Sequence, residues 1–340
     1  MTGRLNGISR WRARYRTSLI FHPPLMSVGL LLIGIAFSTF GCTNITVYKN
    51  PLAELSAAAT RTRVVVETIS LEANRAKVTS LALDAAQNSQ RFGTRELADL
   101  IPEEFIRTRS YGLSLIERLA TRLLEVVDSE QGTTVAKGFE DVGQKAGTLA
   151  SQLGGTKFSH YSGPVSSLAG TIVQIYDQSK REEILKRGVN EGIPQAQVIL
   201  DMLKNDFHAD SQTNVQNALL EELKQQRTEQ IDLYDTLLIS ELKLSAEEKA
   251  RPGRISARLK AINNIIASQE ALNALETQPV SQALDDLSSA LENLRQVVNA
   301  DGDPKTFSKF AAQLTTFSDR SVQLLEAVRA VQRAHAPTSN

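Results

Sequence analysis

Apolar residues recur along most of the chain at alternating steps of three and four positions, the spacing at which one face of an α-helix returns. The pattern is unbroken over residues 284–298 and resumes with the same spacing over residues 307–331. An earlier segment repeats it with Ile255, Leu259, Ile262 and Ile266. Each such helix carries one apolar stripe, which we expect to be buried against other helices.

Capping residues and prolines divide this pattern into separate helices. Asp303 followed by Pro304 is typical of a helix start, and Ser245 and Glu248 have the spacing of a capping box. Four other prolines fit a helix start better than a helix interior: Pro102, Pro164, Pro194 and Pro279. The resulting expectation is helices over residues 51–90, 102–129, 133–153, 164–188, 194–243, 254–276, 279–299 and 304–334.

No run of alternating apolar and polar residues bounded by hairpin turns stands out. The sequence therefore predicts an all-α protein, an elongated bundle of long heptad-patterned helices that follows a signal peptide. The bundle is expected over residues 51–335, and it could divide into two sub-bundles, 51–190 and 191–335.

The amino terminus has the layout of a secretory signal peptide, predicted over residues 1–41. Five arginines precede an apolar run at residues 25–41, and residues 17–48 contain no Asp, Glu, Lys or Arg. The run is slightly shorter than the ~20 apolar residues of a membrane-spanning helix. An uncleaved signal anchor in the inner membrane is therefore the alternative.

Cys42, the only cysteine, directly follows this run and Gly41. The arrangement resembles the lipobox of bacterial lipoproteins, over residues 1–43 only. Thr39 and Phe40 occupy positions where an aliphatic and a small residue are usual. The resemblance implies that Cys42 is acylated and that the signal is cleaved before it. Membrane lipid would then hold the protein through the acyl chains.

An anchored body would reside in the cell envelope, with residues 42–50 as a tether. Thr43 is not the Asp associated with inner-membrane retention, so the resemblance favours the outer membrane if the cell is Gram-negative. A lone cysteine also means that the body contains no internal disulfide and must be stable without one.

Composition and charge argue against a nucleic-acid partner. The chain has 38 basic and 38 acidic residues, and without the five amino-terminal arginines 33 basic residues remain against those 38 acidic ones. A nucleic-acid-binding body usually shows a basic excess on one face. We expect no nucleic-acid partner, and solvated helix surfaces account for most of the charges.

Signals for catalysis are weak. The body has three histidines, each isolated in sequence: His160, His208 and His335. No HExxH motif and no paired cysteine ligands are present, so no metal or cofactor is expected. Ser240 and Lys243 match the SxxK pattern of penicillin-binding enzymes but lack its companion motifs. The body is therefore predicted to be non-enzymatic.

The leading hypothesis is an envelope lipoprotein whose helical body acts as a scaffold or binds a helical partner, which could be a second copy. Eight residues form the candidate seam for that contact, with burial inside the chain as the alternative: Leu284, Leu287, Leu291, Leu294, Phe307, Phe310, Leu314 and Phe317. Two other hypotheses remain open. The glycine-rich segment 131–170 could belong to a pore-forming or membrane-perturbing protein, and distant residues could converge into an envelope hydrolase.

Overall fold

The computed structural model describes residues 45–87, 100–128, 163, 165–168, 181–207 and 214–335, and all regular structure in these ranges is helical. The predicted all-α bundle is confirmed. The main elements are the 3-10 helix η2 (Ile45–Tyr48) and the α-helices α1 (Lys49–Gln87), α2 (Glu103–Asp128), α5 (Arg181–Phe207), α6 (Val215–Glu241), α7 (Ala246–Lys249), α8 (Pro252–Glu276), α9 (Val280–Asn299) and α10 (Pro304–His335). The signal peptide, Cys42 and most of segment 131–170 lie outside the described residues.

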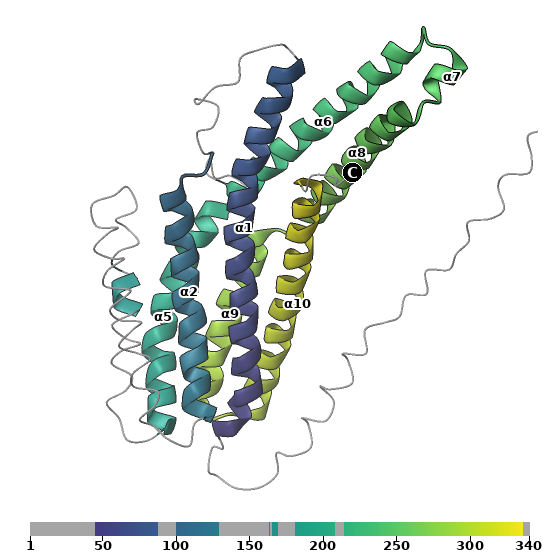
Figure 1. The fold of residues 1–340 in the computed structure, drawn as a ribbon. Coiled ribbons are helices and arrows are strands. Elements are labelled where there is room, and N and C mark those ends of the chain that lie inside the picture. The colour runs from purple at the N-terminus through teal and green to yellow at the C-terminus, as the bar shows by residue number, and fades with distance from the viewer. Residues whose placement is uncertain are drawn as a thin grey trace, which may run out of the picture. The chain divides into compact units, whose positions relative to one another are not determined.

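Residues 43–340 belong to one compact unit. Within it α1 packs against α2, α6 and α10, while α9 packs against α5 and α10 (Figure 1). The core extends through all of these helices. The two helices α6 and α8 lie side by side and leave this bundle together, joined at their far end by α7 (Figure 1).

Two of the predicted helix starts have the expected capping bonds. Asp303 accepts a hydrogen bond from the Thr306 amide at 3.0 Å, with Pro304 as the first helical residue of α10. Ser245 and Glu248 form the reciprocal bonds of a capping box at the start of α7. Both predictions are confirmed because a capping side chain satisfies amides that the first helical turn leaves without partners.

The expectation that Pro194 starts a helix is wrong, because α5 continues through it. A proline inside a helix removes one backbone hydrogen bond and costs about 3 kcal/mol or more. Burial offsets this cost, since Ile193 just before the proline and Ile199 and Leu200 after it are fully buried. Fully burying a side chain of this size contributes about 1.5–3 kcal/mol. Tertiary packing therefore outweighs the local preference of proline.

The predicted single helix over residues 194–243 is also wrong, because α5 ends at Phe207 and α6 begins at Val215. The side chain of Asn214 forms hydrogen bonds with backbone groups at both the end of α5 and the start of α6. Its side-chain oxygen accepts a hydrogen bond from the Asn217 amide at 3.0 Å. Its side-chain nitrogen donates to the Phe207 carbonyl at 3.1 Å. One buried asparagine thus caps the end of α5 and the start of α6.

The contact between α2 and α5 contains a buried ion pair. The Arg109 guanidinium lies 2.6 Å from the Asp206 carboxylate, with side-chain exposures of 2% and 16%. The guanidinium also donates to the Phe105 carbonyl at 3.2 Å and lies over the Phe105 ring. Gly112, one turn further along α2, lies close to α5, because a Cβ there would be only 3.0 Å from Cγ2 of Ile199. The two helices therefore approach closely.

Candidate interaction surface

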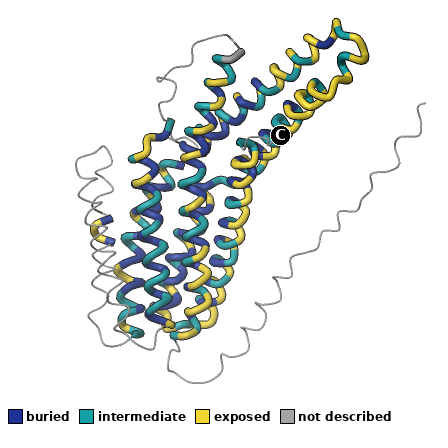
Figure 2. The backbone as a smooth tube through the Cα atoms, viewed as in Figure 1, coloured by how far each residue is buried: buried dark blue, intermediate teal, exposed yellow. Residues whose placement is uncertain are grey.

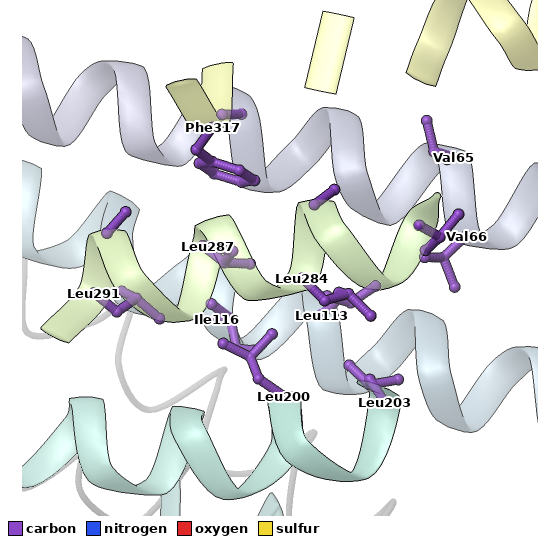
Figure 3. Packing of buried hydrophobic residues seen from close by; sticks show 14 of the residues in the cluster. Val65, Val66, Leu113, Ile116, Leu200, Leu203, Leu284, Leu287, Leu291 and Phe317 are labelled. Atoms are coloured by element: carbon purple, nitrogen blue, oxygen red, sulfur yellow. The ribbon is translucent and has the colours of Figure 1, made fainter. Parts of the chain in front are cut away.

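The structure places all eight residues of the candidate seam in the core, the second of the two alternatives for them. Each has an exposed fraction of 8% or less, and Leu284, Leu287, Leu291 and Phe317 lie among residues of α1, α2 and α5 (Figure 3). These side chains pack within the chain, so they offer no surface to a partner. A docking surface has to be sought elsewhere.

The outer hairpin, residues 230–266, is the part of the described chain with the least buried side chains. Only Glu241 and Ala261 are buried there. Figure 2 shows exposed residues along this segment. Of the twelve exposed large apolar side chains in the described residues, eight belong to it: Ile231, Leu233, Leu238, Ile239, Leu242, Ile255, Leu259 and Ile266. Isolated exposed apolar residues are common on proteins, whereas a large contiguous apolar patch is typical of a binding surface. The hairpin is therefore the candidate interaction surface.

The α8 stripe, predicted from sequence to be buried, is exposed instead. Ile255, Leu259 and Ile266 are 40%, 53% and 50% exposed, and Ile262 is half-buried. The expectation of burial is wrong here because the outer part of α8 has left the bundle. The helices that pack against α8 are α6, along the hairpin, and α10, where α8 joins the bundle. The side chains of Ile255, Leu259 and Ile266 remain open to solvent beside these neighbours.

An open groove of about 400 Å³ runs between the two helices of the hairpin. It is lined by Arg227, Ile231, Ile265, Ile266, Gln269 and Glu270. Ile231 and Leu238 of α6 and Leu242 at its C-cap are spaced by seven and four residues, so they share one helix face. Because Ile231 and Ile266 both line the groove, the apolar stripes of α6 and α8 border the same depression. A helix laid along it would contact both stripes.

The two helices of the hairpin carry opposite charges. The acidic arm, residues 228–242, has four carboxylates and no Lys or Arg: Glu229, Asp232, Asp235 and Glu241. The basic arm, residues 249–269, has five cations and no Asp or Glu: Lys249, Arg251, Arg254, Arg258 and Lys260. Four exposed members form no ion pair within the described residues: Asp232, Asp235, Arg251 and Lys260. The apolar face is therefore flanked by charges without partners.

A cluster of polar contacts holds the tip of the hairpin. Arg258 Nη1 donates to the buried Glu241 carboxylate at 2.7 Å, and Arg258 Nη2 donates to the Lys249 carbonyl at 3.2 Å. Arg254 lies 3.9 Å from the same carboxylate. The capping hydrogen bonds from Ser245 lower the pKa of Glu248. These contacts join α6, α7 and α8 at the tip of the hairpin.

A buried polar network lies where α1, α6 and the end of α10 meet. His335 Nδ1 is 2.6 Å from Glu72 Oε2, with side chains 2% and 5% exposed. Gln226 lies 3.2 Å from the other His335 ring nitrogen and donates to the Ala76 carbonyl. Beside it, Ser80 donates to Glu229 at 3.0 Å. None of these residues lines the groove. Their role is structural, because the network ties the base of α6 to α1 and α10.

The titration of one neighbouring carboxyl group reflects this burial. Burial raises the pKa of Glu222, and the nearby Glu229 carboxylate raises it further, while Lys77 opposes the rise.

Among the described residues, no group of three or more His, Cys, Asp or Glu side chains is placed to hold a metal ion. No helix in the same residues is long and apolar enough to cross a membrane.

The described part of the chain is thus a helical bundle from which the outer hairpin projects. Comparisons of the chain with protein-family models, with curated proteins and with solved structures found no match. The spacing of apolar residues predicts the α8 stripe but not its exposure. The signal that could have suggested this exposure is the concentration of positive charge next to the stripe, at Arg251, Arg254 and Arg258.

Proposed function

We propose that this protein is a lipid-anchored envelope scaffold that assembles helix on helix through its outer hairpin and performs no catalysis. The observation that carries the proposal is the gathering of eight exposed large apolar side chains on that hairpin. Apolar surface contributes about 25 cal/mol per Å² when it is removed from water. A helix packed along the groove would bury both stripes at once.

The lipid anchor rests on the sequence of the amino terminus. A basic segment, an apolar run and a single cysteine at its end resemble the signal of an acylated lipoprotein, with Thr39 and Phe40 as departures from its usual residues. Two or three acyl chains hold a protein stably on a membrane. Thr43 after the cysteine favours the outer membrane in a Gram-negative cell. The scaffold would then present its hairpin from the membrane surface.

We expect radioactive palmitate to label the wild-type protein in growing cells and to leave Cys42→Ala unlabelled. Acylation requires the Cys42 thiol, and the chain has no other cysteine. Labelling is read on gels after membrane fractionation. An unlabelled wild type that keeps its uncleaved mass in the membrane fraction would instead make residues 25–41 a transmembrane anchor.

The hairpin role predicts that Leu259 is covered in the envelope and exposed in the purified, diluted protein. We expect Leu259→Cys to react with a polar maleimide at least about tenfold more slowly in isolated envelopes than after purification, since a packed helix excludes the reagent. The extent of labelling is read peptide by peptide by mass spectrometry.

Val322→Cys on α10 is the matched control, because Val322 is 45% exposed and Leu259 is 53% exposed. It should react at the same rate in both preparations. Equal reactivity of Leu259→Cys in envelopes and in solution would show that the hairpin is uncovered, and the proposed function would fall.

A further inference from the structure

We propose that the partner of the outer hairpin is the outer hairpin of a second copy of this chain, with α6 of each copy packed on α8 of the other. The inference rests on the proposed function, because it names the occupant of the same surface. It is carried by the charge pattern of the two arms together with the apolar stripes between them.

The apolar part of the surface is self-complementary. Ile231, Leu238 and Leu242 form the stripe of α6, and Ile255, Leu259 and Ile266 belong to the stripe of α8. Two hairpins stacked face to face would place four stripes around one core. That is the arrangement of a four-helix bundle, in which each helix lies antiparallel to its neighbours.

The charges decide which helices meet. With α6 on α8 of the partner, the acidic arm of each copy lies along the basic arm of the other, twice in a two-fold dimer. With α6 on α6, Asp232 and Asp235 would face their own copies, and the cations of α8 would do the same. Like charges brought together at an interface cost several kcal/mol. The charges therefore favour only the first pairing.

The exposed charges that have no ion-pair partner among the described residues fit this role. Asp232 and Asp235 on the acidic arm and Arg251 and Lys260 on the basic arm are all exposed. Arg258 already binds Glu241 within its own hairpin. A second copy would supply the opposite charge that these four side chains lack.

The test reverses the charge of one arm at a time in the full-length protein. One variant carries Asp232→Lys and Asp235→Lys, and the other carries Arg251→Glu and Lys260→Glu. Two differently tagged copies are expressed together and extracted from membranes in mild detergent. Capture on the first tag is followed by quantification of the second. Circular dichroism checks that each exposed-site variant remains folded.

We expect wild type to capture wild type, and each variant to capture itself at least about tenfold less, the factor that corresponds to 1.4 kcal/mol. The two different variants together should capture each other within about twofold of wild type. In that mixed dimer every reversed arm again faces its opposite. Each variant also disturbs the attraction between α6 and α8 of its own hairpin, but mixing cannot repair that defect. Recovery on mixing therefore reports contact between chains.

Adding Leu259→Asp to both members of the mixed pair should abolish capture again, since it places a carboxylate within the apolar core. Val322→Asp, outside the hairpin, should leave capture unchanged. Two results would overturn the inference. One is that each charge-reversed variant captures itself as well as wild type does, and the other is that capture is lost in each variant and does not return when the two variants are mixed.

Two outcomes separate the inference from the proposed function. No wild-type self-capture, together with a protected Leu259→Cys in envelopes, would leave the scaffold function standing with another protein as partner and overturn the second-copy inference. Protection of Leu259→Cys in the purified monomer by vesicles of anionic phospholipid would mean that the hairpin lies on a membrane, and it would overturn both.

Discussion

Phe317→Ala is expected to lower the free energy of unfolding by about 3–5 kcal/mol, the usual cost of removing a large aromatic side chain from a packed core. Phe317 is fully buried on α10 and lies beside Leu287 of α9 (Figure 3). The loss combines the lost transfer of the ring from water with the cavity left behind, which the neighbouring helices fill only in part. Urea denaturation followed by circular dichroism measures it.

Val322→Ala on the same helix is the control, because Val322 is 45% exposed. Its effect should stay within about 0.5 kcal/mol. The comparison also separates the two roles that the sequence allows for the candidate seam. If Phe317 contacted a partner rather than the core, its replacement would weaken association and leave unfolding of the single chain nearly unchanged.

Asp206→Ala is expected to destabilise the protein by about 3–5 kcal/mol, because it leaves the buried Arg109 guanidinium without its carboxylate. The Phe105 carbonyl and ring remain as partners, but neither carries a negative charge. Combining it with Arg109→Met should recover part of this loss, since methionine fills a similar space without a charge. The same urea experiment on the two single variants and the double variant gives the coupling between the sites.

Glu326→Ala provides the matched exposed pair, because Glu326 and its partner Arg329 are 56% and 54% exposed. Solvent screens such a pair, so the change should cost less than about 1 kcal/mol. If the effects of Arg109→Met and Asp206→Ala on the free energy of unfolding were additive, the two residues would not interact. That result would contradict the explanation that Asp206→Ala destabilises the protein by leaving the Arg109 charge buried without its carboxylate.

Local signals along the chain determined where most helices lie. The heptad spacing of residues 284–298 and 307–331, with the prolines before each, predicts α9 and α10 to within one residue at each end. The capping residues Ser245 and Asp303 mark the starts of α7 and α10. These signals are readable because helix period and capping bonds join residues only three or four positions apart.

Helix breaks depended on more distant contacts. Pro194 has a strong local preference for a helix start, but the apolar spacing of Leu185, Val189 and Ile193 continues past it to Leu200. Only burial against α2 and α9 decides that the helix runs on. Asn214 differs, because its bond with the Asn217 amide spans three residues and is a local capping signal, while its bond to the Phe207 carbonyl requires the chain to turn back toward the end of α5.

The sequence by itself determined an all-α chain with several apolar stripes, whereas the tertiary structure decided which stripes face water. The stripes of α9 and α8 have the same spacing, yet Leu284 is fully buried and Leu259 is 53% exposed. The physical reason is that burial depends on which helices pack alongside. Helix α9 lies among α1, α5 and α10, whereas α8 packs against α6 and α10 and its outer part projects beyond the bundle. Periodicity shows that a face is apolar, and only the packing of distant segments determines what covers it.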